Sequence, residues 1–188
     1  MTLQTFTLGT FAQQGLAAGS FESIATVTVG AGGTSTVTFS SIPATYAHLQ
    51  LRVIARSNNA GNIIYGAASK ANNDSGSNYT YHFLYGNGSS AQAIAASSQT
   101  SLNIVTQVGN GFTSNVFAAN VIDILDYANT NKYKTFRILS GADGNGSGQI
   151  QFNSALWMST SAINSISFTG GDTFLQYSHF ALYGIKAA

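Results

Sequence analysis

Few side chains in this sequence could do acid–base or metal chemistry. The chain of 188 residues has six carboxylates, three histidines and no cysteine. It contains no G-x-S-x-G nucleophile elbow, no phosphate-binding G-x-x-x-x-G-K and no zinc-binding H-E-x-x-H. Of the histidines, His82 and His179 stand among strand aromatics, a setting more typical of a packed, hydrogen-bonded residue than of a general base. We therefore expect no catalytic residues and no cofactor.

One carboxylate lies inside an apolar run. Asp123 is flanked by isoleucines within Ile122–Leu125, and a carboxylate in such surroundings must be paired or heavily hydrogen-bonded. Arg52 or Arg137 on a facing strand would supply the partner. The prediction is a structural ion pair that fixes strand register. The alternative is a polysaccharide-degrading enzyme that depends on Asp123 or Asp126.

Two loops have the oxygen-rich composition of a calcium site, NNDSG at 72–76 and a glycine-rich loop further along the chain. Asp143 and Asn145, in the run DGNGSG over 143–148, match the first half of an EF-hand loop. The twelfth position of that pattern is Ser154 instead of glutamate, and no helical segment flanks the loop. We expect a turn here and no bound metal.

Hydrophobic periodicity predicts strands and no long helix. Residues 49–55 alternate clearly, with Leu49, Leu51 and Val53 on one side and Gln50 and Arg52 on the other. The expected strands are 24–29, 34–39, 46–56, 63–67, 79–85, 102–108, 116–125, 132–139, 149–157, 163–168 and 175–185, with a loop or edge strand at 91–101. Such spacing predicts an all-β, antiparallel β-sandwich of the jelly-roll type.

One of these expected strands differs from the others. Residues 116–125 are apolar on both faces, as in a strand that is covered on each side.

The sequence divides into two parts. Residues 21–188 are expected to form a single β-sandwich domain, and residues 1–20 an uncharged, extended N-terminal arm. Among the apolar residues of the arm, four have a spacing typical of neither a helix nor one strand: Phe6, Leu8, Phe11 and Leu16. Because such side chains on a free tail promote association, we expect them to dock on a neighbouring subunit. A frayed terminus is the alternative.

Composition excludes several partners. Lys+Arg number 7 and Asp+Glu 6, so charged residues make up only 7% of the chain, whereas about a quarter is usual. A net charge of +1 argues against nucleic-acid binding, which depends on many phosphate contacts. No run approaches the roughly 18 apolar residues that span a bilayer, so no membrane partner is expected.

The chain is rich in aromatic residues, with 12 phenylalanines and 9 tyrosines. Together with abundant asparagine, they suit either sugar binding by stacking or dense packing among identical subunits, where charge is depleted. For the sugar-binding alternative, the candidate stacking residues are Tyr65, Tyr79, Tyr81, Tyr85 and Trp157.

Several sequence segments, in a fixed order, carry a resemblance to a known family. They are FESIATVTVG at 21–30, FSSIPATY at 39–46, HLQLR at 48–52, DSGSNY at 74–79, VIDILDYANTNKYKT at 121–135 and FALYGIK at 180–186. Across roughly residues 20 to 186 the chain resembles β-sandwich virion structural proteins of tailed bacteriophages. The resemblance implies a non-enzymatic, trimeric protein and brings no catalytic residues with it.

The expected function is therefore capsid decoration, or cementing, on the surface of a phage particle. Its partners would be other copies of itself, as a homotrimer, and virion proteins such as the major capsid protein, after synthesis in the host cytoplasm. The alternative is a tail-fibre or receptor-binding protein that recognises host surface glycans.

Overall fold

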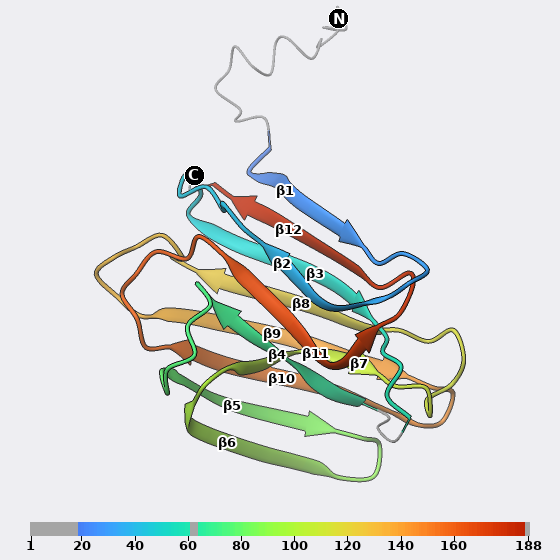
Figure 1. The fold of residues 1–188 in the computed structure, drawn as a ribbon. Coiled ribbons are helices and arrows are strands. Elements are labelled where there is room, and N and C mark those ends of the chain that lie inside the picture. The colour runs from blue at the N-terminus through green and yellow to red at the C-terminus, as the bar shows by residue number, and fades with distance from the viewer. Residues whose placement is uncertain (1–18, 61–63, 187–188) are drawn as a thin grey trace, which may run out of the picture.

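The computed structural model describes residues 19–60 and 64–186, which form twelve β-strands and no helix (Figure 1). The strands are β1 (Phe21–Thr28), β2 (Thr34–Phe39), β3 (His48–Ala55), β4 (Ile64–Ala71), β5 (Tyr79–Gly86), β6 (Ala91–Gln99), β7 (Leu102–Val108), β8 (Ala118–Leu125), β9 (Lys134–Asp143), β10 (Gly148–Trp157), β11 (Ile166–Phe174) and β12 (His179–Ile185). The prediction of an all-β fold is confirmed.

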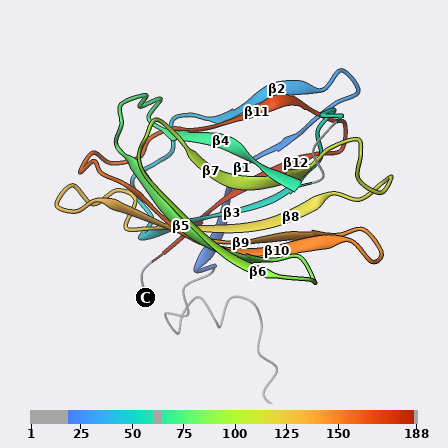
Figure 2. The same cartoon turned by 90° about the horizontal axis from the view of Figure 1, so that it is seen from below.

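The strands form two antiparallel sheets that pack as a sandwich, which confirms the jelly-roll-like prediction (Figure 2). The larger sheet has eight strands in the order β1-β12-β3-β8-β9-β10-β5-β6. The smaller sheet has four, in the order β2-β11-β4-β7. Residues 91–99 form the edge strand β6, one of the two possibilities that the sequence left open.

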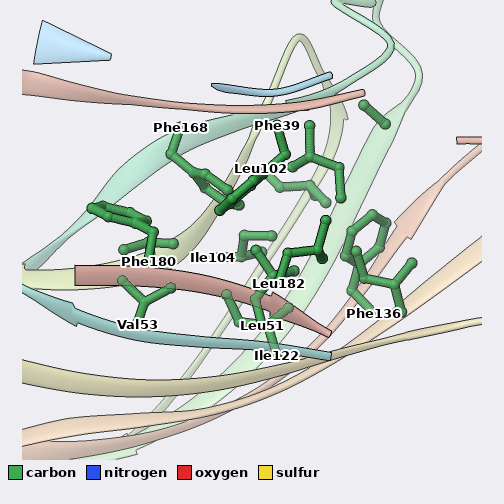
Figure 3. Packing of buried hydrophobic residues seen from close by; sticks show 14 of the residues in the cluster. Phe39, Leu51, Val53, Leu102, Ile104, Ile122, Phe136, Phe168, Phe180 and Leu182 are labelled. Carbon is green, nitrogen blue, oxygen red and sulfur yellow. The ribbon is translucent and has the colours of Figure 1, made fainter. Parts of the chain in front are cut away.

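The core lies between the sheets and is built by strand alternation. In β3, Leu49, Leu51 and Val53 are buried while the residues between them point away. Phe168 of the smaller sheet meets Phe180 of the larger sheet with ring centroids 5.8 Å apart (Figure 3). Each fully buried side chain of this size contributes about 1.5–3 kcal/mol, so the alternating inward residues hold the two layers together.

Strands β4, β9 and β11 continue at least four residues beyond their predicted ends, and β11 continues furthest. The periodicity indicated a strand over 163–168, whereas β11 continues to Phe174. A register shift between Thr169 and Phe174 accommodates Gly170 and Gly171, which look like a turn in the sequence. The strand resumes because Phe174 is buried against Phe180, with ring centroids 5.1 Å apart.

Candidate functional site

The eight-stranded sheet has a second face, which points away from the smaller sheet. We call it the outer face. In β8, Ile122 and Ile124 point into the core, so Val121, Asp123 and Leu125 point outward. Eight large apolar side chains on the outer face are 39–62% exposed: Phe21, Ile54, Leu84, Val121, Leu125, Leu139, Ile150 and Phe152. The two-sided apolar pattern of residues 116–125 thus belongs to a strand that the described residues cover on one side only.

Four of these side chains form a continuous stripe across adjacent strands. Val121 of β8 lies opposite Leu139 of β9, and Leu139 lies opposite Phe152 of β10. Phe152 in turn lies opposite Leu84 of β5. With strands about 4.8 Å apart, this apolar row is about 14 Å long. Residues far apart in sequence therefore make one contiguous apolar surface, with a small hollow of about 380 Å³ beside Leu84 and Phe152.

A polar row runs beside the apolar row. Its members, on five neighbouring strands, are Gln50, Asp123, Arg137, Ser154 and His82. Gln50 Nε2 donates to Asp123 Oδ1 at 2.8 Å, and Arg52 Nε donates to Gln50 Oε1 at 3.1 Å. Glutamine thus bridges the carboxylate and Arg52.

The predicted ion pair of Asp123 with Arg52 or Arg137 needs correction. Among the described residues, neither guanidinium lies within 4.0 Å of the Asp123 carboxylate. Arg137 is directly opposite Asp123, as expected of a register partner, but it donates to Ser154 Oγ. Because Asp123 is half-buried on the outer face and not in the core, a neutral amide partner and solvent are enough for it.

Arg52 instead joins an aromatic cluster at the β1 edge of the sheet. The rings of Phe21 and Tyr183 lie 4.9 Å apart, and the Arg52 guanidinium carbon lies 5.4 Å and 5.8 Å from their centroids. A cation over aromatic faces is attracted by their quadrupoles. The cluster fixes the first residue of β1 on the outer face.

An open groove of about 1190 Å³ crosses the outer face on the other side of the apolar row. Ala119 and Gly141, opposite each other on β8 and β9, form its low floor. A Cβ on Gly141 would stand 2.5 Å from the Gln149 carbonyl oxygen, so glycine permits the close approach of β10. Ser147, in the hairpin between β9 and β10, and Asn87, in the turn after β5, line the rim.

Two of the predicted stacking residues are buried, which corrects their assignment. Tyr79 is 0% exposed and Trp157 2%, with ring centroids 6.4 Å apart. Trp157 Nε1 donates to Asp74 Oδ2 at 2.7 Å, and Tyr79 Oη donates to the carbonyl oxygens of Ala71 and Asp74. They are core anchors, and a ligand in solvent does not reach them.

Electrostatics around these anchors follow from the same contacts. Hydrogen bonds from Trp157 and Asn78 hold the pKa of Asp74 below its usual range. Burial raises the pKa of Tyr79 to about 12. Both shifts favour the state seen in the structure, an ionised Asp74 beside a neutral phenol.

The remaining stacking candidates belong to two different sheets. Tyr81 and Tyr85 flank Phe83 on the inner side of β5, with successive ring centroids 5.9 Å apart, and both tyrosines are half-buried. Tyr65 belongs to β4 of the other sheet, and its side chain lies outside the description. The arm residues Phe6, Leu8, Phe11 and Leu16 also lie outside the described residues.

The calcium candidates belong to a hydrogen-bonded turn. Asp143 Oδ1 accepts from the Asn145 amide at 2.8 Å, and Asn145 has a φ of 62°. Within 19–60 and 64–186, no three His, Cys, Asp or Glu residues gather in a group that could hold a metal ion. The Asp143 carboxylate therefore acts as an Asx-turn acceptor, which the sequence pattern of Asn, Asp and Gly also suits.

Two interior cations were missed by the sequence analysis. Lys134 is buried, and its Nζ donates to the carbonyls of Asn129, Lys132 and Thr160; burial lowers its pKa. Arg56 is buried as well and donates to three carbonyls of the 112–116 loop. Lys134 stands at a position of β9 that alternation assigns to the core side, together with Phe136 and Ile138, and this alternation could have indicated that Lys134 is buried.

No family model and no curated protein matches the chain. Solved structures match over most of it, at low similarity. A CBM40 module of a Ruminococcus gnavus IT-sialidase, bound to α2,3-sialyllactose, has a TM-score of 0.35 and 8% identity, covering 85% of this chain and 91% of that one. A PL-14 alginate lyase from Aplysia kurodai has a TM-score of 0.33 and 13% identity, covering 85% and 79%.

A third similar structure is the enzymatically active domain of tailspike protein 2 of bacteriophage CBA120. Its TM-score is 0.33 and its identity 10%, with 90% of this chain and 29% of that chain covered. Similarities this low concern the β-sandwich fold alone. Separately, no helix long and apolar enough to cross a membrane occurs in the described part of the chain.

Proposed function

We propose that this protein is a non-enzymatic structural protein of a tailed-bacteriophage virion, and that it assembles through the outer face of its eight-stranded sheet. The role that we favour is capsid decoration or cementing on the head. The observation that carries the proposal is the contiguous apolar surface on that face, centred on Val121, Leu139 and Phe152. The resemblance of six sequence segments to virion proteins supplies the biological setting.

The size of the surface suits a lasting protein interface. Six of the eight side chains lie on one side of the polar row, all but Phe21 and Leu125, and at about half exposure they present about 500 Å², if a large apolar side chain offers about 170 Å² when fully exposed. The largest patch on a typical monomer is about 300–600 Å² and is often functional, and one partner in a standard interface buries about 800 Å². An apolar surface of this extent favours a function in which it becomes covered.

The charge distribution favours the same function. The whole chain carries 7 basic and 6 acidic residues. On the outer face, Asp123 accepts from Gln50 and Arg137 donates to Ser154, so each of these two charges already has a hydrogen-bond partner within the chain. Covering such a face costs less desolvation than covering free charges.

The test is to locate the protein on particles of the phage that encodes it. We would label intact virions with gold-conjugated antibody raised against the purified protein and, in parallel, add purified protein to heads that lack it. Gold over the head and rebinding to bare heads are expected. Leu139→Asp on the outer face should abolish rebinding, whereas Thr38→Asp on the exposed side of β2 should not. Virions without label would overturn the proposal.

A receptor-binding role is the second candidate, because of the groove. Tyr183 offers a ring at one end, and the amides of Asn87 and Gln149 line its rim. Aromatic rings and amides are groups that can stack on and hydrogen-bond a neutral sugar. In this role, gold would mark the tail and the protein would bind host glycans on an array. Asn87→Ala with Gln149→Ala should abolish that binding, while the exposed Asn131→Ala should leave it intact.

A further inference from the structure

The groove on the outer face is open along its length, and its floor is uncharged. Ala119 and Gly141 keep it low, and the hairpin at Ser147 and the turn at Asn87 raise its rim. We propose that residues 4–11 in the N-terminal arm of one copy occupy this groove on a neighbouring copy. The inference deepens the proposed function and rests on it, because it names the partner that covers part of the assembly face.

The chemistry of the arm complements that of the groove. Residues 1–20 contain no charged side chain, and their large apolar residues are separated by small or uncharged polar ones, such as Thr7, Gly9 and Ala12. An extended segment of this kind can place rings and branched chains on a floor of alanine and glycine. A hollow with raised rims takes a single narrow segment more readily than the flat sheet of a second copy.

The arm is long enough to fill the groove. From Tyr183 on β12 to Gly86 on β5 the groove crosses five strand spacings, which is about 24 Å. Seven or eight extended residues cover that distance, at about 3.3 Å each. The 18 residues before Gly19 reach about 60 Å. With residues 4–11 in the groove, residues 12–18 are left to bridge between two copies, over about 23 Å.

Strand direction favours the groove of a neighbour over that of the same chain. In β1, Thr28 lies opposite His179, which lines the groove, whereas Phe21 lies opposite Ile185 at the far end of β12. Ser20 continues in the same direction, because its carbonyl accepts from Lys186 N at 3.0 Å. The chain before β1 thus leads away from its own groove, whose nearest lining residue, Tyr183, lies opposite Ser23, about 10 Å behind Ser20. A neighbour is reached without a reversal.

Site-directed disulfides test the proposal directly, because the natural chain has no cysteine. One full-length variant carries Leu8→Cys in the arm, and a second carries Ser147→Cys on the groove rim. The two are mixed, oxidised with diamide and separated on a non-reducing gel. We expect a mixed disulfide dimer, with a yield at least tenfold above that obtained with the control Thr38→Cys, an equally exposed position on β2.

Other outcomes would overturn the proposal in distinguishable ways. If a chain carrying both Leu8→Cys and Ser147→Cys forms only an internal disulfide, the arm lies in its own groove. If Leu8→Cys forms a disulfide equally well with Ser147→Cys and with the control Thr38→Cys, or with neither of them, the groove does not bind the arm.

A second variant serves as an independent measurement. We expect the natural chain to self-associate in sedimentation velocity, and we expect the full-length chain with serine at Phe6, Leu8, Phe11 and Leu16 to lose this self-association. Self-association that is unchanged in this variant would indicate that two outer faces pair directly. The two proposals can fail separately. If the mixed disulfide forms but the antibody does not label virions, the proposed function is refuted and the contact between arm and groove is retained.

Discussion

Two adjacent residues of β9 allow folding to be separated from assembly by one experiment. Ile138 points into the core and is 1% exposed, whereas Leu139 points to the outer face and is 51% exposed. We would replace each by serine in the full-length chain. The two substitutions share a strand, a backbone conformation and a change in side-chain size, so they differ chiefly in the face that they affect.

The expected magnitudes follow from burial. Ile138→Ser removes a fully buried side chain, leaves a cavity and buries a hydroxyl, which together cost about 3–5 kcal/mol. Full burial of a leucine side chain contributes about 2 kcal/mol, and Leu139 is about half-buried in the monomer. Leu139→Ser should therefore cost about 1 kcal/mol of folding stability. In assembly the order reverses. Loss of a central apolar side chain from an interface costs about 2 kcal/mol of binding free energy. This loss weakens self-association about 30-fold.

Urea unfolding of dilute protein would measure the first quantity, and sedimentation velocity over a range of concentrations the second. A cost above about 3 kcal/mol for Leu139→Ser would mean that the folded monomer itself covers this side chain. Unchanged self-association in Leu139→Ser would show that the outer face is not an interface. Either result refutes the reasoning from the apolar row.

Three further predictions concern the interior. Asp74→Asn should cost about 1–3 kcal/mol in urea unfolding, because it disturbs the acceptor of the Trp157 indole. Hydrogen bonding lowers the pKa of Asp74 in the folded state, so ionised Asp74 contributes its full stabilisation above pH about 4. This stabilisation is lost as the pH falls through the lowered pKa, and the stability of Asp74→Asn should lack this part of the decrease in acid. Burial raises the pKa of Tyr79 to about 12, so alkaline titration should remove about 3 kcal/mol between pH about 10 and 12, and Tyr79→Phe should be less sensitive there. Lys134→Met should cost about 1–3 kcal/mol, because three carbonyls lose their donor.

The parts of the fold that depend on local alternation were predictable. In residues 49–55 the period of two identified β3 and assigned Leu51 and Arg52 to opposite faces, as the structure has them. The aromatic strand β5 shows where this reasoning stops. Tyr79 and Tyr81 share a parity, yet Tyr79 is fully buried and Tyr81 is half-buried. Burial along that strand depends on where the smaller sheet covers it, which is a property of the whole fold.

Side-chain pairing was predictable only as far as strand register was. The sequence placed Asp123 in a strand and Arg137 as a candidate partner, and the two do lie opposite each other. The carboxylate nevertheless accepts from Gln50, which β3 places on its other side. Which of two neighbouring side chains bonds to the carboxylate depends on strand order and on side-chain rotamers. Neither of these can be derived from the pattern of a single sequence.

The outer face follows from combining local alternation with strand order. Each of Val121, Leu139, Phe152 and Leu84 looks unremarkable within its own strand, because isolated apolar residues occur on every protein surface. They become one surface only because β8, β9, β10 and β5 are neighbours in the sheet. Folding requires apolar residues only at the positions of these strands that point into the core. The fold therefore gives no reason for leucine, valine and phenylalanine to stand together at the positions that point outward. An apolar row that no described residue covers, on a chain this poor in charge, is better explained by a partner that covers it, and this is why the proposed function rests on the outer face.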